Sequence, residues 1–290
     1  MEFKARLPDH EVNVSKTHPL SEAAWSIGGV VFLCVVLFAS VFLAIELIVP
    51  RISPASEQNF FGAFHNQLSK VADELDSPEA LRLQELTESL VKHWPDCPYT
   101  FRVGIMDSED PNAMALPGGI IVVTRALLDE AQSENEVAFV LAHELGHFRN
   151  RDHLRGLGRG VAFGVVGSLI LGSSGSGLPS LVEQMSTLTE RNFSRGQESE
   201  ADSFALQLTH AQYGHLEGAT DFFERMAAEE LGKGGRLAIY LQTHPASMDR
   251  VDNLQAQADT EGWPTTGPVI PWQFAPAESD PQAESPVPDP

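Results

Sequence analysis

Basic side chains are scarce in this protein. The chain of 290 residues has 19 Lys and Arg against 40 Asp and Glu, a formal net charge of −21. Because binding to nucleic-acid phosphates requires clustered basic side chains, and the sequence has no such cluster, the composition argues against a nucleic-acid partner. Cysteine is also rare: Cys34 lies in the most apolar part of the chain and Cys97 far along it. Two isolated cysteines exclude a disulfide framework and a zinc site built from cysteine pairs.

Charged residues are missing altogether between Ser26 and Ile45, a stretch rich in Val, Leu, Ile and Phe. A helix needs about 20 such residues to cross the hydrocarbon core of a membrane. The sequence therefore predicts an N-terminal segment over residues 1–24 and one transmembrane helix over residues 25–49. A cleaved signal peptide is the competing interpretation, but the apolar run is long, starts well inside the chain and lacks a small-x-small cleavage site.

The few basic residues near this span indicate its orientation. Lys4, Arg6 and Lys16 precede it, whereas only Arg51 and Lys70 follow it closely. Because basic residues are retained on the cytoplasmic side, this bias favours an N terminus in the cytoplasm. We expect the rest of the chain to face outward.

The remainder of the chain predicts a mainly helical α+β domain over residues 53–263. Apolar residues at three- and four-residue spacing predict helices over residues 60–75, 78–92, 178–195 and 198–210. Short β-branched or aromatic runs bounded by Pro, Gly and Asp predict a small sheet with strands at residues 99–106 and 119–124.

Two further segments differ from this pattern. Residues 160–171 form a second apolar run, but a helix of that length reaches only about 18 Å, too short to cross a membrane. A buried or membrane-dipping segment is expected there, with an ordinary core helix as the alternative, and the Gly- and Ser-rich residues 172–177 follow as a flexible loop. Residues 264–290 are rich in Pro and acidic side chains and lack Lys and Arg. They are expected to form a disordered tail.

A helix is predicted to begin at Ser133, because Ser133 and Glu136 match a capping box and apolar residues follow at helical spacing. It contains the sequence His143-Glu144-Leu145-Gly146-His147. On a helix this spacing places both imidazoles on one face, one turn apart, where they can share a metal ion. Glu144 can take a proton from a metal-activated water that attacks a carbonyl. The pattern therefore predicts a zinc hydrolase that cleaves amides; two surface histidines on a helix are the alternative.

Catalytic zinc normally takes three protein ligands and leaves one position open, so a third ligand must come from elsewhere. Glu198 is the candidate, and Asp202 lies one turn further on the same face of a helix. Asp202 can orient a ligand histidine through the other ring N–H. Glu200 should point elsewhere. Three acids this close together are otherwise typical of a solvated helix face, so the assignment depends on the two histidines.

Four motifs follow one another between Asn112 and Arg250. They are Asn112-Ala113-Met114-Ala115-Leu116-Pro117-Gly118-Gly119, HELGH at residues 143–147, Ser194-Arg195-x-x-Glu198-x-x-Ala201-Asp202, and His244-Pro245-Ala246 with Arg250. This combination resembles the membrane-linked gluzincin metallopeptidases, which include the HtpX heat-shock proteases and the CaaX prenyl proteases. The joint pattern is far more specific than any one motif.

The resemblance implies a zincin-like fold and a role for each matching residue. It implies zinc held by His143, His147 and Glu198, Glu144 as general base, His244 near the developing oxyanion, and Asp202 and Arg250 as supporting residues. A set of residues before and at the second strand is implied to bind substrate: Asn112, Ala113, Pro117, Gly118 and Gly119. We expect the strand after Gly119 to accept an extended peptide by edge pairing.

The expected function is a membrane-anchored zinc endopeptidase with unfolded or misassembled polypeptides as substrates. By resemblance, its role is quality control of membrane or envelope proteins, from a bacterial inner membrane with the catalytic domain in the periplasm. Prenyl-protein chemistry is not transferred, because this chain has one clear span. The alternatives are a zinc-stabilised, chaperone-like protein that holds extended polypeptides without cleavage, and a zinc hydrolase with another substrate. The intact Glu144 favours an enzyme.

Overall fold

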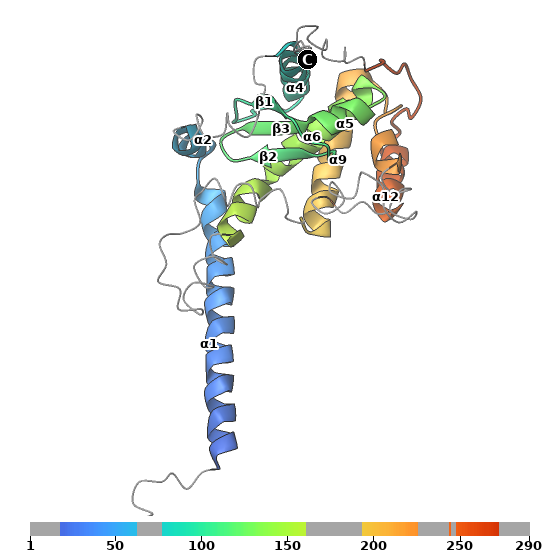
Figure 1. Ribbon diagram of the computed structural model, residues 1–290. Helices are drawn as coiled ribbons and strands as arrows, with labels where there is room; N and C mark the ends of the chain where they lie inside the picture. Colours follow the sequence, from blue (N-terminus) through green and yellow to red (C-terminus); the bar gives the residue numbers. More distant parts are fainter. Residues whose placement is uncertain (1–17, 63–76, 161–192, 226–243, 245–247, 273–290) are drawn as a thin grey trace, which may run out of the picture. The chain divides into compact units, whose positions relative to one another are not determined.

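The computed structural model describes residues 18–62, 77–160, 193–225, 244 and 248–272 (Figure 1). The chain divides into two units, Met1–Leu47 and Ile48–Pro290. The predictions for residues 161–171, for the Gly- and Ser-rich loop and for residues 178–192 of the helix predicted over residues 178–195 fall outside the described residues. That helix is wrong at its end, because Phe193 and Ser194 are not helical and Ser194 caps a new helix that begins at Arg195.

Helix α1 (Pro19–Ile48) contains the whole uncharged stretch. Its 30 residues extend over roughly 45 Å at 1.5 Å per residue. It is long and apolar enough to cross a membrane, and its large side chains are exposed, with Trp25 at 83% and Phe32 at 70%. A helix that is apolar all round and unburied is what a lipid environment requires. The predicted span is therefore a candidate membrane helix, and it begins earlier than predicted, at Pro19.

A short 3-10 helix (Val49–Arg51) and helix α2 (Pro54–Gly62) follow α1 along the chain. The predicted helix over residues 60–75 is wrong at its start, because α2 begins at Pro54, where Pro suits the first turn of a helix. Residues 63–75 are not described. Glu57 and Phe61 of α2 are buried in the second unit.

The sheet has three strands in the described part of the chain: β1 (Arg102–Met106), β2 (Ala113–Leu116) and β3 (Ile120–Thr124). Their order is β1-β3-β2, with β1 parallel and β2 antiparallel to β3. The expected strand after Gly119 exists, but it is the central one. The prediction that it offers a free edge to a peptide is wrong, because the motif before Gly118 and Gly119 itself forms a strand that covers that edge. Among the described strands, β1 and β2 are the outer ones.

Gly118 and Gly119 make the turn between β2 and β3, with φ of 95° and 86°. L side chains are strained at such angles. A Cβ on Gly119 would also lie only 2.5 Å from the carbonyl oxygen of Thr100. Glycine is therefore required in this turn, which sets the pairing of β2 with β3.

The two faces of the sheet belong to different apolar clusters, because side chains alternate along a strand. Val103, Ile105, Ala113, Ile121 and Val123 join the main core, together with the helices. On the other face a small second cluster consists of Met114, Leu116, Ile120 and Val122. The sheet is thus buried on both sides.

Besides α2, the described part of the second unit contains the helices α4 (Pro78–Val91), α5 (Arg125–Glu130), α6 (Glu134–Asn150), α9 (Arg195–Tyr213) and α12 (Met248–Glu261). The helices predicted over residues 78–92 and 198–210 and the one starting at Ser133 are confirmed. Figure 1 shows α6 beside the strands and α9 across it, in agreement with the contacts of α6 with β2 and α9. A Cβ on Gly146 would lie 2.7 Å from Cα of Ala201. Glycine therefore lets α9 approach α6 closely where both carry motif residues.

The chain after Pro264 continues to pack against the domain. The carbonyl of Ile270 accepts a hydrogen bond from Glu134 N–H, and Pro271 forms an isolated bridge with Ser133. Trp272 is 8% exposed and belongs to the main core. The expectation of a disordered tail is therefore wrong for residues 264–272, because Trp272 buries enough apolar surface to hold the segment. Residues 273–290 are not described.

We predict that Trp272→Ala lowers the free energy of unfolding by about 3 kcal/mol, through the loss of a large core side chain. The matched control is Val269→Ala, because Val269 lies in the same segment and is 45% exposed. Denaturant unfolding of both variants measures the difference. Equal effects of the two substitutions would contradict the burial of Trp272.

Candidate active site

Helix α6 presents the two histidines because its start is set by local chemistry. Ser133 Oγ accepts a hydrogen bond from Glu136 N–H, as the capping-box prediction requires. The second half of the box differs, since the Glu136 carboxylate accepts from Gln132 N–H and pairs with Arg225. At the other end Arg151 adopts the left-handed conformation, with φ of 61°, and ends the helix. His143 and His147 are fully buried on α6.

The side chains of His143, His147, Glu198 and His244 form a buried cluster whose ligand atoms lie within 4.8 Å of one another. Nε2 of His143 lies 3.1 Å from Nε2 of His147 and 3.5 Å from Oε2 of Glu198. Nε2 of His147 lies 3.4 Å from Oε1 of Glu198. Ligand atoms about 2.05 Å from a tetrahedral zinc ion are separated by about 3.3 Å. These three predicted ligands therefore fit a zinc ion in both chemistry and spacing.

Asp202 and Arg250 lie directly behind two of these ligands. Oδ1 of Asp202 is 2.9 Å from Nδ1 of His143. Arg250 donates two hydrogen bonds to the Asp202 carboxylate, at 2.7 and 2.8 Å, and its Nη1 lies 2.8 Å from Oε2 of Glu198. Burial raises the pKa of Glu198, but the charges of His244 and His143 outweigh it and hold that pKa well below its ordinary value. Glu198 is therefore an ionised carboxylate, as a zinc ligand must be.

Asp152 is a site residue that the sequence analysis missed. Its Oδ2 lies 3.0 Å from Nδ1 of His147, and its Oδ1 accepts a hydrogen bond from the Gln197 side chain. Each histidine on α6 thus has its own carboxylate behind it. Burial lowers the pKa of His147, but hydrogen bonds with Asp152 and Glu198 raise it to about 10. Metal binding would therefore release a proton from His147. The only signal in the sequence was an acid shortly after the end of the helix.

Glu144 is fully buried, and neither carboxylate oxygen has a well-aligned hydrogen-bond donor among the described residues. Nε2 of His244 lies 3.6 Å from its Oε1, and the backbone of Ala115 in β2 lies beside it. Burial raises the pKa of Glu144 above its ordinary value. A buried carboxylate whose donors are poorly aligned indicates a group that is completed by a ligand or water.

His244 turns Nδ1 toward the cluster, 3.2 Å from Nε2 of His143 and 3.1 Å from Oε1 of Glu198. Its two ring nitrogens therefore face different partners: Nδ1 the candidate metal ligands, and Nε2 the carboxylate of Glu144. It is 2% exposed. The structure thus places His244 at the candidate metal site, although the sequence analysis gave it no ligand role.

The residues predicted to bind substrate lie on and beside β2. Asn112 is buried, and its Oδ1 accepts a hydrogen bond from Ala113 N–H. The carbonyl of Asn112 accepts from Thr124 N–H, so by alternation Ala113 and Ala115 direct their backbone groups to the outer edge of β2, which pairs with no other described strand. Gly118 donates its N–H to Glu57. Of this set, Ala113 is placed at the edge and Gly118 is turned to another partner.

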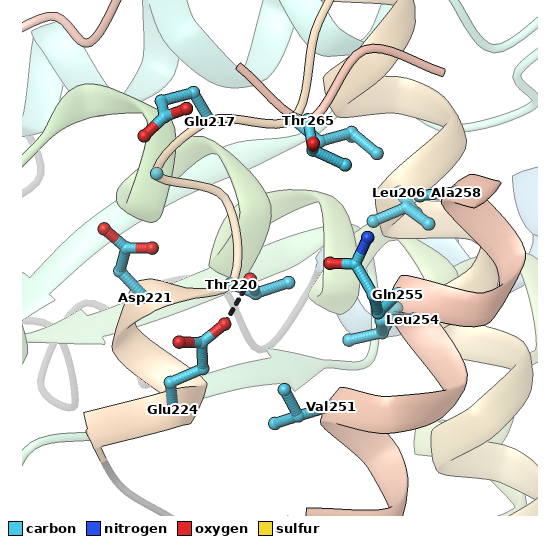
Figure 2. Close-up of a pocket in the computed structure, with 12 residues that line it drawn as sticks. Leu206, Glu217, Thr220, Asp221, Glu224, Val251, Leu254, Gln255, Ala258 and Thr265 are labelled. Carbon is cyan, nitrogen blue, oxygen red and sulfur yellow. Dashed lines mark hydrogen bonds between the residues drawn. The ribbon is translucent and has the colours of Figure 1, made fainter. Parts of the chain in front are cut away.

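A separate pocket lies beside α12. Figure 2 shows the carboxylates of Glu217, Asp221 and Glu224 on one side and residues of α12, such as Gln255, on the other. Thr220 donates a hydrogen bond to Glu224 there. None of the metal-cluster side chains lines this pocket. It therefore borders the helix that carries Arg250 and is distinct from the metal cluster.

The fold and this cluster define a metallopeptidase of the HExxH, gluzincin type. The sequence model of peptidase family M48 matches residues 77–258, more than half of the chain, so this protein belongs to peptidase family M48. The resemblance stated from the motifs is thereby confirmed.

Curated relatives are similar over 55 to 64% of this chain. The mitochondrial metalloendopeptidase OMA1 of Arabidopsis thaliana is 37% identical over 164 residues, 55% of this chain and 32% of that protein. Metalloprotease LoiP of Escherichia coli is 28% identical over 193 residues, 64% of this chain and 73% of that protein. The beta-barrel assembly-enhancing protease of Yersinia pestis is 26% identical over 169 residues, 55% of this chain and 35% of that protein. The chain thus spans about a third of the first and third relatives and most of the second.

Proposed function

We propose that this protein is a membrane-anchored zinc endopeptidase in which Glu144 is the general base. The observation that supports this most is the spacing of the ligand atoms of His143, His147 and Glu198, 3.1 to 3.5 Å apart, with the buried carboxylate of Glu144 in the next position along α6. A zinc ion held there would polarise water and the substrate carbonyl.

The surrounding residues keep this site in one geometry. Asp202 orients His143, Asp152 orients His147, and Arg250 holds both Asp202 and Glu198. Carboxylates behind ligand histidines fix the ring orientation and strengthen the ligands. Glu144 accepts a proton from the attacking water, and its raised pKa brings it closer to the working pH, where a general base is most effective.

His244 acts on the substrate in this proposal. Catalysis needs one open position on the metal, so the three ligands are His143, His147 and Glu198, and His244 serves as a donor. A donor aimed at the carbonyl oxygen stabilises the charge that develops there. The position of His244 beside both Glu144 and the ligands supports this role.

The free edge of β2 is the proposed place for an extended peptide. Ala113 and Ala115 turn backbone groups to that edge, and Ala115 lies beside Glu144. The Ala113 N–H is already bonded to Asn112 Oδ1 and the Ala115 backbone interacts with Glu144, so a peptide would pair with the remaining backbone groups of these two residues. Because pairing uses backbone groups, it tolerates many substrate sequences.

Protein quality control at a bacterial envelope is the proposed setting. Helix α1 would anchor the domain in the inner membrane, and the basic residues before it favour a periplasmic catalytic domain. The name of the Yersinia pestis relative refers to beta-barrel assembly, a process of envelope proteins. Unfolded or misassembled polypeptides are therefore the proposed substrates.

The test is metal analysis and proteolysis with the full-length chain in detergent. We expect about one zinc ion per chain and cleavage of an unfolded protein such as casein. Removal of the metal with a chelator should abolish cleavage, and added zinc should restore it. Zinc at this level without cleavage of any unfolded protein would favour the chaperone-like alternative, in which the same edge only holds polypeptides.

A further inference from the structure

Glu57 is a buried carboxylate that the proposed chemistry does not use. It lies on α2, a few residues after the candidate membrane helix, and is 2% exposed. Buried carboxylates are costly unless hydrogen bonds and opposite charges compensate them. Neighbouring donors and positive charges must therefore compensate the burial of Glu57.

Each oxygen of Glu57 has two partners, and all four come from distant parts of the chain. Oε1 accepts from Gly118 N–H at 2.9 Å and lies 2.8 Å from Nε2 of His153. Oε2 accepts from the Tyr99 hydroxyl at 2.9 Å and from Arg151 at 3.0 Å. Burial raises the pKa of Glu57, but His153 and the other donors outweigh it, so that pKa lies below its ordinary value.

Two of these partners flank the carboxylate that supports His147. Arg151 and His153 bind Glu57, and Asp152 between them lies 3.0 Å from Nδ1 of His147. Arg151 is also held in the left-handed conformation, which is unfavourable for a residue with a side chain. One carboxylate on α2 thus binds the side chains of both neighbours of Asp152.

The third partner lies at the substrate side of the site. Gly118 belongs to the turn that joins edge strand β2 to β3, and the backbone of Ala115 in β2 lies beside Glu144. α2 makes two further contacts near this turn: Gln58 donates to the Thr100 carbonyl, and a Cβ on Gly118 would lie 3.0 Å from Cβ of Phe61. Helix α2 therefore packs closely against this turn.

We propose that Glu57 is a positioning residue that holds Asp152 against His147, and so ties the segment leaving the membrane helix to a metal ligand. The proposal rests on the zinc site of the proposed function. It implies that the site is fully formed only when α2 is seated on the domain. Glu57 touches neither substrate nor metal, and acts through the 151–153 segment.

Zinc affinity of the full-length chain in detergent tests this role. We expect Glu57→Gln to weaken zinc binding about tenfold. Loss of a group that supports a metal ligand has an effect of this size at other zinc sites. Glu85→Gln is the matched control, because Glu85 is exposed on α4 and loses the same charge. The visible spectrum of the cobalt-substituted protein should change in Glu57→Gln alone, since His147 reorients.

A double-mutant cycle separates positioning from general stabilisation. Asp152→Asn should weaken zinc binding by about 10- to 100-fold, and adding Glu57→Gln to it should cause no further loss, because both act through His147. Additive losses, or a Glu57→Gln variant that melts earlier while binding zinc like the Glu85→Gln control, would overturn the proposal.

Arg151→Gly provides a second route if Glu57→Gln does not fold. Gly is favoured at the φ of Arg151, so the helix end is kept while one link to Glu57 is lost. We expect weaker zinc binding here as well, and unchanged affinity would count against the role. If the native chain binds zinc but cleaves nothing, the peptidase assignment is wrong. The zinc affinities of the Glu57 and Arg151 variants then still test the positioning role. A chain without zinc affinity would overturn both.

Discussion

Glu144→Gln is expected to keep its zinc and lose cleavage by at least about a thousandfold, within the range for removing a general base. Gln has the size and shape of Glu but cannot accept the proton of the attacking water. The substitution also removes a buried charge that lacks well-aligned donors, so the fold should not suffer. Zinc content and the rate of casein cleavage, measured on the same preparation, decide the outcome.

Glu200→Gln is the matched control for this experiment. Glu200 is exposed on α9, two positions after Glu198, and faces away from the cluster as the helical spacing predicted. The same chemical change there should leave both zinc content and cleavage at the native level. If Glu144→Gln cleaves as fast as Glu200→Gln, another group takes the proton and the assignment of the base is wrong.

The parts of the site that could be predicted are those encoded by one helix at a time. Ser133, the apolar periodicity and the spacing of His143 and His147 are all local, so the sequence sufficed to place them on one face of α6. Glu198 and Asp202 follow the same logic on α9. Their meeting with α6 was an expectation from the family pattern. Its physical reason, the close approach at Gly146 and Ala201, became visible only in the structure.

The parts that could not be predicted depend on contacts between distant segments. Asp152 follows the end of α6, and its direction is set by the left-handed Arg151 and by Glu57, 94 positions earlier. The sequence analysis treated Ala113–Leu116 as part of a motif and did not predict that these residues form strand β2. It therefore placed the strand after Gly119 at an edge of the sheet, because strand order depends on contacts between distant segments. The burial of Trp272 was not predicted, because the Pro-rich composition of the segment around it is typical of disorder.

The second large effect is expected at the third ligand. Glu198→Ala should lose zinc, and with it all cleavage, because two histidines alone hold the ion weakly. The variant also removes one partner of Arg250, which keeps its two hydrogen bonds to Asp202. The domain should therefore stay folded, which circular dichroism can confirm. Zinc content of the purified protein is the measurement.

His244→Ala tests which three of the four clustered side chains bind the metal. If Nδ1 of His244 lies near the ligands only as a donor for the substrate, the variant keeps zinc and cleaves about 100- to 1000-fold more slowly. Zinc retained in Glu198→Ala but lost in His244→Ala would reverse the assignment and make His244 the third ligand. Because the ligand atoms of all four side chains lie within 4.8 Å of one another, the geometry alone allows either assignment and the two variants decide between them.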